Sequence, residues 1–102
     1  MGCNITTEWV SGNVFIRPMI LAKAGDVVQG HAHNFDHTTI VFSGSVRIEA
    51  KTPDGREIDR VFKSPRPDWA GGSHALIKAE VAHKITALED NTIAWCVYAH
   101  RD

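Results

Sequence analysis

The stretch Gly30-His31-Ala32-His33-Asn34-Phe35-Asp36-His37 contains three of the six histidines in this 102-residue chain. Side chains two positions apart on a strand point to the same face, so His31 and His33 can converge on one target. His37 joins them if the extended run continues through it. In a helix, His31 and His33 would lie about 200° apart and could not reach one ion. The spacing therefore predicts a strand with a shared imidazole face; a polar loop with solvent-facing histidines is the competing interpretation.

Length and composition indicate one globular domain spanning residues 1–102. Hydrophobic residues make up 43% of the chain and charged residues 23%, and the formal net charge is -1. This balance offers no basic surface for nucleic acid, and no apolar run reaches the roughly 18 residues of a membrane span. The two cysteines, Cys3 and Cys96, lie far apart and form no C-x-x-C pair, so we expect a cytoplasmic protein.

Turn-forming residues divide the chain into short segments that are rich in β-branched and aromatic residues. Pro53-Asp54-Gly55 is a hairpin signal between two of these segments. The segments that we expect to be strands are Val14–Leu21, Thr38–Ser43, Ser45–Ala50, Glu57–Phe62, His74–Ile77, His83–Leu88 and Thr92–Ala99. Several short strands without a long helical period predict an all-β antiparallel sandwich or barrel.

A later histidine, His83, follows the same alternation. It shares parity with Val81, Ile85 and Ala87, which are apolar, whereas Lys84 falls on the other face. We therefore place His83 on the buried face of its strand, where an imidazole needs a partner. A metal ion is one candidate for that partner, and a backbone carbonyl is the other.

The spacing around the first cluster resembles a known family motif. Gly25, His31, His33, His37 and Gly44 follow cupin motif 1, G-x5-H-x-H-x3or4-E-x6-G. Every spacing fits, and one letter departs, because His37 stands where the family usually has glutamate.

The second cupin motif, G-x5-P-x-G-x2-H-x3-N, is kept only in part. Gly72 and His83 fit it at the right separation, whereas Lys78, Glu80 and Ala87 replace its proline, glycine and asparagine. The resemblance covers about residues 14–99, and its specificity comes mainly from the first motif.

The resemblance implies a single-domain cupin, built as an antiparallel jelly-roll β-barrel with one divalent transition metal inside. The ligands carried over by position are His31, His33, His37 and His83, and the ion would be zinc, nickel, iron, copper or manganese. The resemblance also implies a homodimer, with an edge strand such as Val14–Leu21 as a plausible contact. The implied function is a dioxygenase or isomerase acting on a small molecule. The alternative is a non-enzymatic module in which the ion is structural or holds a small ligand.

An all-histidine ligand set differs from the family pattern in its charge. With His37 in place of glutamate, a site holding a divalent ion carries about +2 rather than +1, which favours an anionic ligand. Four protein ligands fill a tetrahedral site but leave two open positions in an octahedral one. The sequence leaves both geometries open.

Three further polar residues have weaker claims on this site. Asp36 is an alternative carboxylate ligand, but its parity is opposite to that of His37. His74 matches no ligand position, and we expect it at the surface or the rim. Cys96 faces either the core or the pocket.

Apolar side chains are expected to surround the ion. Val41, Ile85 and Trp95 are the candidates for lining the barrel, with Phe42 or Phe35 at its mouth. Core packing is the simpler role for each of them.

Overall fold

The computed structural model describes residues 4–5, 9–29, 36–69, 71–77 and 82–99. All regular elements in these ranges are β-strands. In chain order they are β1 (Asn4–Ile5), β2 (Trp9–Ser11), β3 (Val14–Leu21), β4 (Val27–Gln29), β5 (His37–Ser43), β6 (Ser45–Lys51), β7 (Glu57–Lys63), β8 (His74–Ile77), β9 (Ala82–Ala87) and β10 (Thr92–Ala99). These ranges contain no helix long and apolar enough to cross a membrane.

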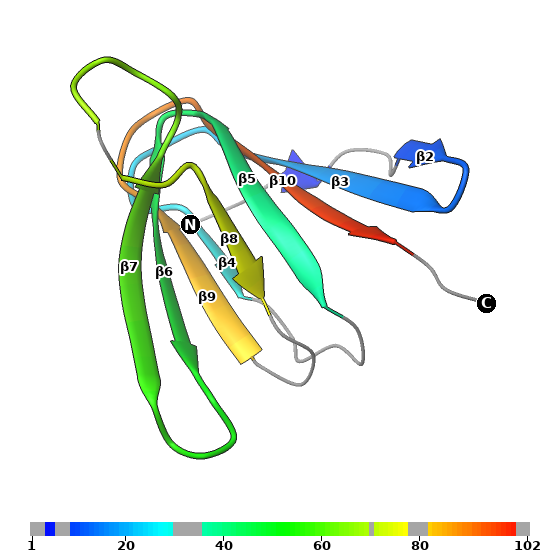
Figure 1. Cartoon of the computed structure of the whole chain (residues 1–102). Helices are drawn as coiled ribbons and strands as arrows, with labels where there is room; N and C mark the ends of the chain where they lie inside the picture. The colour runs from blue at the N-terminus through cyan, green and yellow to red at the C-terminus, as the bar shows by residue number, and fades with distance from the viewer. Residues whose placement is uncertain (1–3, 6–8, 30–35, 70, 78–81, 100–102) are drawn as a thin grey trace.

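The strands form two antiparallel sheets (Figure 1). The first, here called the six-stranded sheet, has the order β1-β3-β10-β5-β8, with β2 also paired to β3. The second, the four-stranded sheet, has the order β4-β9-β6-β7. Neither β7 nor β8 has a second partner strand within the described ranges, so the jelly roll is open between them.

All seven strands predicted from the sequence are present, with ends that agree to within one residue. The hairpin signal is also confirmed, because β6 and β7 pair in register from Ser45↔Lys63 to Lys51↔Glu57 across the Pro53-Asp54-Gly55 turn. Three short strands were not predicted. β1, β2 and β4 have only two or three residues each, too few for a visible alternation.

Side chains from the inner faces of both sheets form the core. Leu21, Val41, Val46 and Ile85 are fully buried, and Cys96 packs against this cluster. The alternation along β9 is as predicted, since His83, Ile85 and Ala87 are buried and Lys84 is exposed. Of the two positions that the sequence left open for Cys96, core or pocket, the structure shows packing against the core.

The expectation that Val14–Leu21 lies at a sheet edge is wrong. β3 pairs with β10 along its whole length, and β1 and β2 pair with its other side. The reversal at Gly12-Asn13 folds the short strand β2 back onto β3, with Ser11 opposite Val14. A three-residue strand that depends on this tertiary pairing has no signal of its own in the sequence.

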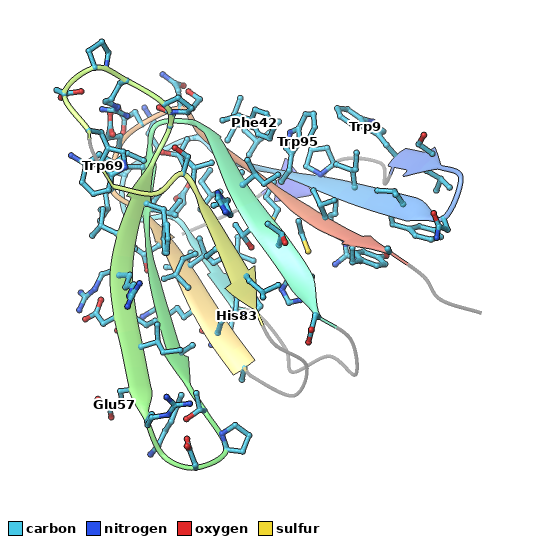
Figure 2. All side chains as sticks on the ribbon, viewed as in Figure 1. Trp9, Phe42, Glu57, Trp69, His83 and Trp95 are labelled. Carbon is cyan, nitrogen blue, oxygen red and sulfur yellow. The ribbon has the colours of Figure 1, made fainter. Side chains whose placement is uncertain are left out.

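Large aromatic side chains cover the outer side of the six-stranded sheet (Figure 2). Trp95 contacts Phe42, with ring centroids 4.1 Å apart, and meets Trp9 edge to face at 5.1 Å. The expectation that Trp95 lines the barrel and Phe42 its mouth is therefore wrong. Ala94 and Cys96 take the inward positions of β10, and alternation then directs Trp95 outward. Phe35 lies outside the described residues.

Candidate metal centre

Two of the four predicted ligands meet inside the barrel, one from each sheet. His37 is the first residue of β5 in the six-stranded sheet, and His83 is the second residue of β9 in the four-stranded sheet. Their exposed fractions are only 3% and 7%. The two ring centroids lie 5.1 Å apart, with the planes tilted by 45°. Residues 46 positions apart in the chain thus form a buried imidazole pair.

Strand alternation explains why these two rings face each other. On β5, His37 shares its inward face with Thr39 and Val41, and all three are buried. On β9, His83 shares its inward face with Ile85. Because both strands turn the same parity toward the space between the sheets, the imidazoles project into one interior rather than toward solvent.

The spacing of the two rings fits binding to a single ion. Imidazole nitrogens bind zinc at about 2.0–2.1 Å, and the ring centre lies about 1.2 Å further out. Two rings on one ion, at tetrahedral or octahedral angles, then have centroids about 4.6–5.4 Å apart. The 5.1 Å separation of His37 and His83 falls within this range. Both Nδ1 atoms are also shielded from solvent.

His31 and His33 lie outside the described residues, so their prediction as ligands stays a prediction. Among the residues that the structure does describe, no three His, Cys, Asp or Glu side chains gather as a metal-binding group. Asp36 is exposed, next to the buried His37, as its opposite parity predicted. His74 is exposed on β8, also as expected.

Comparison with solved structures places this arrangement in a known fold. The chain is similar to oxalate decarboxylase OxdC of Bacillus subtilis, to oxalate decarboxylase of the same organism at pH 4.6, and to an oxalate decarboxylase structure that addresses the substrate binding mode. Each comparison has a TM-score of 0.71 at 21% sequence identity, over 85% of this chain. The chain has the cupin fold. It spans about one fifth of the length of these structures, 21% in each case. No protein-family model matches the sequence, and no curated protein matches it significantly.

Within this fold, Gly44 closes the turn that joins β5 to β6. Its φ of +75° lies in the left-handed region, and a Cβ atom there would come within 3.0 Å of the Cα and Cβ of Thr92 and still closer to Thr92 Oγ1. The last glycine of the first motif thus has a steric reason to be glycine.

A polar network secures the same end of the cupin barrel. The Arg66 guanidinium donates to Gly44 O at 2.9 Å, to Ser64 Oγ at 3.1 Å and to Glu89 Oε2 at 3.1 Å. Hydrogen bonds from the Ser45 side chain, and then from Arg66, hold the pKa of Glu89 below its usual range. His37 begins β5 and Gly44 directly follows it, so the two lie about 23 Å apart in regular strand geometry. The network therefore supports the fold rather than the imidazole pair.

One polar residue on the inward face beside the imidazole pair, Thr39, was missed in the sequence analysis. Thr39 is only 1% exposed, and no described group hydrogen bonds to its Oγ1 atom. It lies two positions from His37 on the same inward face and pairs in register with Cys96. The signal that could have found it is its parity with the first histidine cluster.

Proposed function

We propose that the chain is a metal-dependent enzyme that holds one divalent transition metal inside the barrel and acts on a small molecule. His37 and His83 would bind the ion, together with His31 and His33 of the first motif. The observation that carries this proposal is the meeting of His37 and His83 across the two sheets, at a separation that suits two ligands of one ion.

The chemistry of the site follows from imidazole ligands in an apolar surrounding. Neutral imidazoles suit iron, nickel, copper and zinc better than magnesium or calcium, which prefer oxygen ligands. When bound, such an ion supplies Lewis-acid polarisation of a substrate oxygen or activation of dioxygen. The chain's own contribution is to hold the imidazoles in place and to exclude water, since the inward neighbours Val41 and Ile85 are each 1% exposed.

Elemental analysis tests the metal site directly. The protein would be purified without a histidine tag or a nickel column, and we expect about one first-row divalent ion per chain. His37→Ala and His83→Ala should each abolish stoichiometric metal, whereas His74→Ala, at an exposed histidine on β8, should retain it. If the wild type holds no metal and gains no thermal stability from added Zn, Ni, Fe or Cu, the proposal fails.

A dioxygenase or an isomerase is the reaction class that we propose, with a non-enzymatic metal module as the alternative. Oxygen consumption by the Fe(II)-loaded protein, screened over small carboxylates and diketones, separates the two. Turnover that is lost in His83→Ala supports the enzyme. Stoichiometric metal without open coordination positions, combined with no turnover, supports the module.

A second copy of the chain is the partner that we propose. The outward positions of β3, β10 and β5 carry no charged side chain; they include Ile16, Pro18, Trp95, Val97, Thr38, Ile40 and Phe42. The outer side of the four-stranded sheet differs, since it carries Arg47, Glu49 and Lys84. An uncharged face can meet its own copy about a two-fold axis without placing like charges opposite each other. Phe42 and Trp9 are 47% and 48% exposed on that face and would be covered.

A further inference from the structure

A cavity opens where the two sheets fail to pair. It has a volume of about 690 Å³ and lies between β7, the last strand of the four-stranded sheet, and β8, the last strand of the six-stranded sheet. Its apolar wall includes Ile48, Ala50, Phe62 and Ala75, which belong to the core or pack against it. The cavity therefore leads from the surface toward the barrel interior, and we call it the β7–β8 cavity.

This cavity adjoins the strands that carry the imidazole pair. Ala50, in its wall, is the register partner of His83, and Ala75, in the facing wall, is the register partner of Thr39. Thr39 in turn lies two positions from His37 on the same face. Ala50 and Ala75 in the cavity wall are thus each one strand away from a residue of the inner face on which the imidazole pair lies.

Arg60 is an exposed cation on the side of the edge strand β7 that faces the cavity. The register pairs Arg60 with Ile48, which is 2% exposed, while its neighbours Ile58 and Phe62 pair with Ala50 and Val46. Arg60 therefore shares the inward parity of the core residues, and it lines the β7–β8 cavity. Because β7 is the edge strand of its sheet, the Arg60 side chain is nevertheless exposed to solvent.

Among the residues that the structure describes, Arg47 and Arg56 have acidic partners, whereas Arg60 has none. Arg47 binds Asp59 with N–O distances of 2.8 and 2.5 Å, and this contact holds the pKa of Asp59 below its usual range. Arg56 binds Asp54 within the turn. Among the described residues, no carboxylate forms an ion pair with Arg60. Its guanidinium is thus available to an anion from outside the chain.

We propose that the β7–β8 cavity binds a small carboxylate with an apolar body. The Arg60 guanidinium would bind the carboxylate through two parallel hydrogen bonds, the geometry that this group favours. The apolar wall would contact the hydrocarbon part, and the buried Thr39 hydroxyl would donate a hydrogen bond to a polar atom at the inner end. Arg60 and His83 are separated by two strand spacings across the sheet and by two residues along it, which places their Cα atoms about 12 Å apart. One small molecule can therefore reach from the Arg60 guanidinium to the His83 side chain.

This inference rests on the proposed function in one respect only, namely that a bound metal ion would lie near the inner end of the ligand. The carboxylate contact at Arg60 is independent of any ion. Titrations are therefore made on both metal-free and metal-loaded protein, with metal content measured separately. If metal is absent but the Arg60-dependent contact remains, the proposed function fails and this inference stands. If metal is present but the Arg60-dependent contact is absent, this inference fails and the proposed function stands.

The test is a calorimetric and NMR titration with benzoate, using benzamide as the uncharged probe of the same shape. We expect benzoate to bind and to shift the amide signals of β7 and β8, and benzamide to bind at least tenfold more weakly. Loss of one charge-assisted contact should make Arg60→Gln roughly ten- to a hundredfold weaker. Arg60→Lys should recover part of the affinity. Thr39→Val should weaken benzoate several-fold without loss of native stability.

The matched control is Arg47→Gln, which removes the same charge from the outer face of the same hairpin. Equal effects of Arg47→Gln and Arg60→Gln, or equal binding of benzoate and benzamide, would overturn the proposal. Inorganic phosphate binding as tightly as benzoate would also overturn it, because the apolar wall would then contribute nothing. Inward charges on edge strands also oppose aggregation. If Arg60→Gln aggregates faster but its monomer binds benzoate like the wild type, edge protection is the role of Arg60 and the proposal fails.

Discussion

Replacing Gly44 by alanine tests whether the β5–β6 turn requires glycine for steric reasons. An L-residue in the left-handed region costs about 1–2 kcal/mol, and φ at Gly44 is +75°. The new Cβ would lie 3.0 Å from the Cα and Cβ of Thr92, and backbone atoms cannot rotate away. Overpacking of this kind costs about 1–3 kcal/mol. Displacing Thr92 also breaks its 2.8 Å hydrogen bond to Glu89 O, a further cost of about 1 kcal/mol.

These contributions together lower the free energy of unfolding by about 3–6 kcal/mol, a large share of the stability of a small domain. Urea unfolding followed by tryptophan fluorescence measures the change through linear extrapolation. Gly12→Ala is the matched control, because Gly12 has a φ of +60° but no atom within 4 Å of an added Cβ. It should lose only the backbone cost of about 1–2 kcal/mol. If the two variants are equally destabilised, the steric argument at Gly44 is refuted.

Three further predictions concern single side chains. Because the folded pKa of Glu89 is depressed, its stabilising contribution is present above the unfolded value of about 4.3 and is lost as pH falls through the folded value. The stability difference between wild type and Glu89→Gln should therefore shrink from pH 7 to pH 3 in urea unfolding; a difference independent of pH contradicts this reasoning. Thr39→Val removes a buried hydroxyl that no described group pairs with, so the metal-free protein should gain about 1 kcal/mol in the same assay. A marked loss of stability would show that the hydroxyl is satisfied in the native state. Trp95→Lys puts a charge on the uncharged outer face, so sedimentation velocity should find a dimer for wild type and a monomer for the variant. Equal sedimentation of the two proteins removes this face from the interface.

The strands were predictable because their signals are local. The segment from Val14 to Leu21 is apolar and rich in strand-forming residues apart from Arg17 and Pro18, and the structure reproduces both of its ends. The prediction that failed is the one about the neighbours of this strand, which was expected to lie at a sheet edge. Its pairing with β2 depends on a three-residue segment beyond the turn at Gly12, and no local pattern encodes which strand such a segment will join.

The site was predictable where one face of a strand is apolar and the other is not. This contrast placed His83 inward correctly, because Lys84 marks the solvent side. On β10 both faces are apolar, so parity could not tell Trp95 from Cys96, and the preference of aromatic residues for the interior gave the wrong answer. Arg60 was missed for a related reason. Polar residues occur at both parities of β7, and only its register with β6 reveals which face is inward.

The position of the imidazole pair would link the proposed metal binding to the joining of the two sheets. The Arg66 network and the Gly44 turn hold one end of β5, whereas His37 begins the other end and faces His83 from the opposite sheet. An ion bound by both rings would cross-link the two sheets at the end that the network does not reach. Such a site does not exist in the unfolded chain, so its binding free energy becomes folding free energy. Metal binding should therefore stabilise both sheets together rather than the loops alone, and it should do so while the β7–β8 side stays open to a ligand.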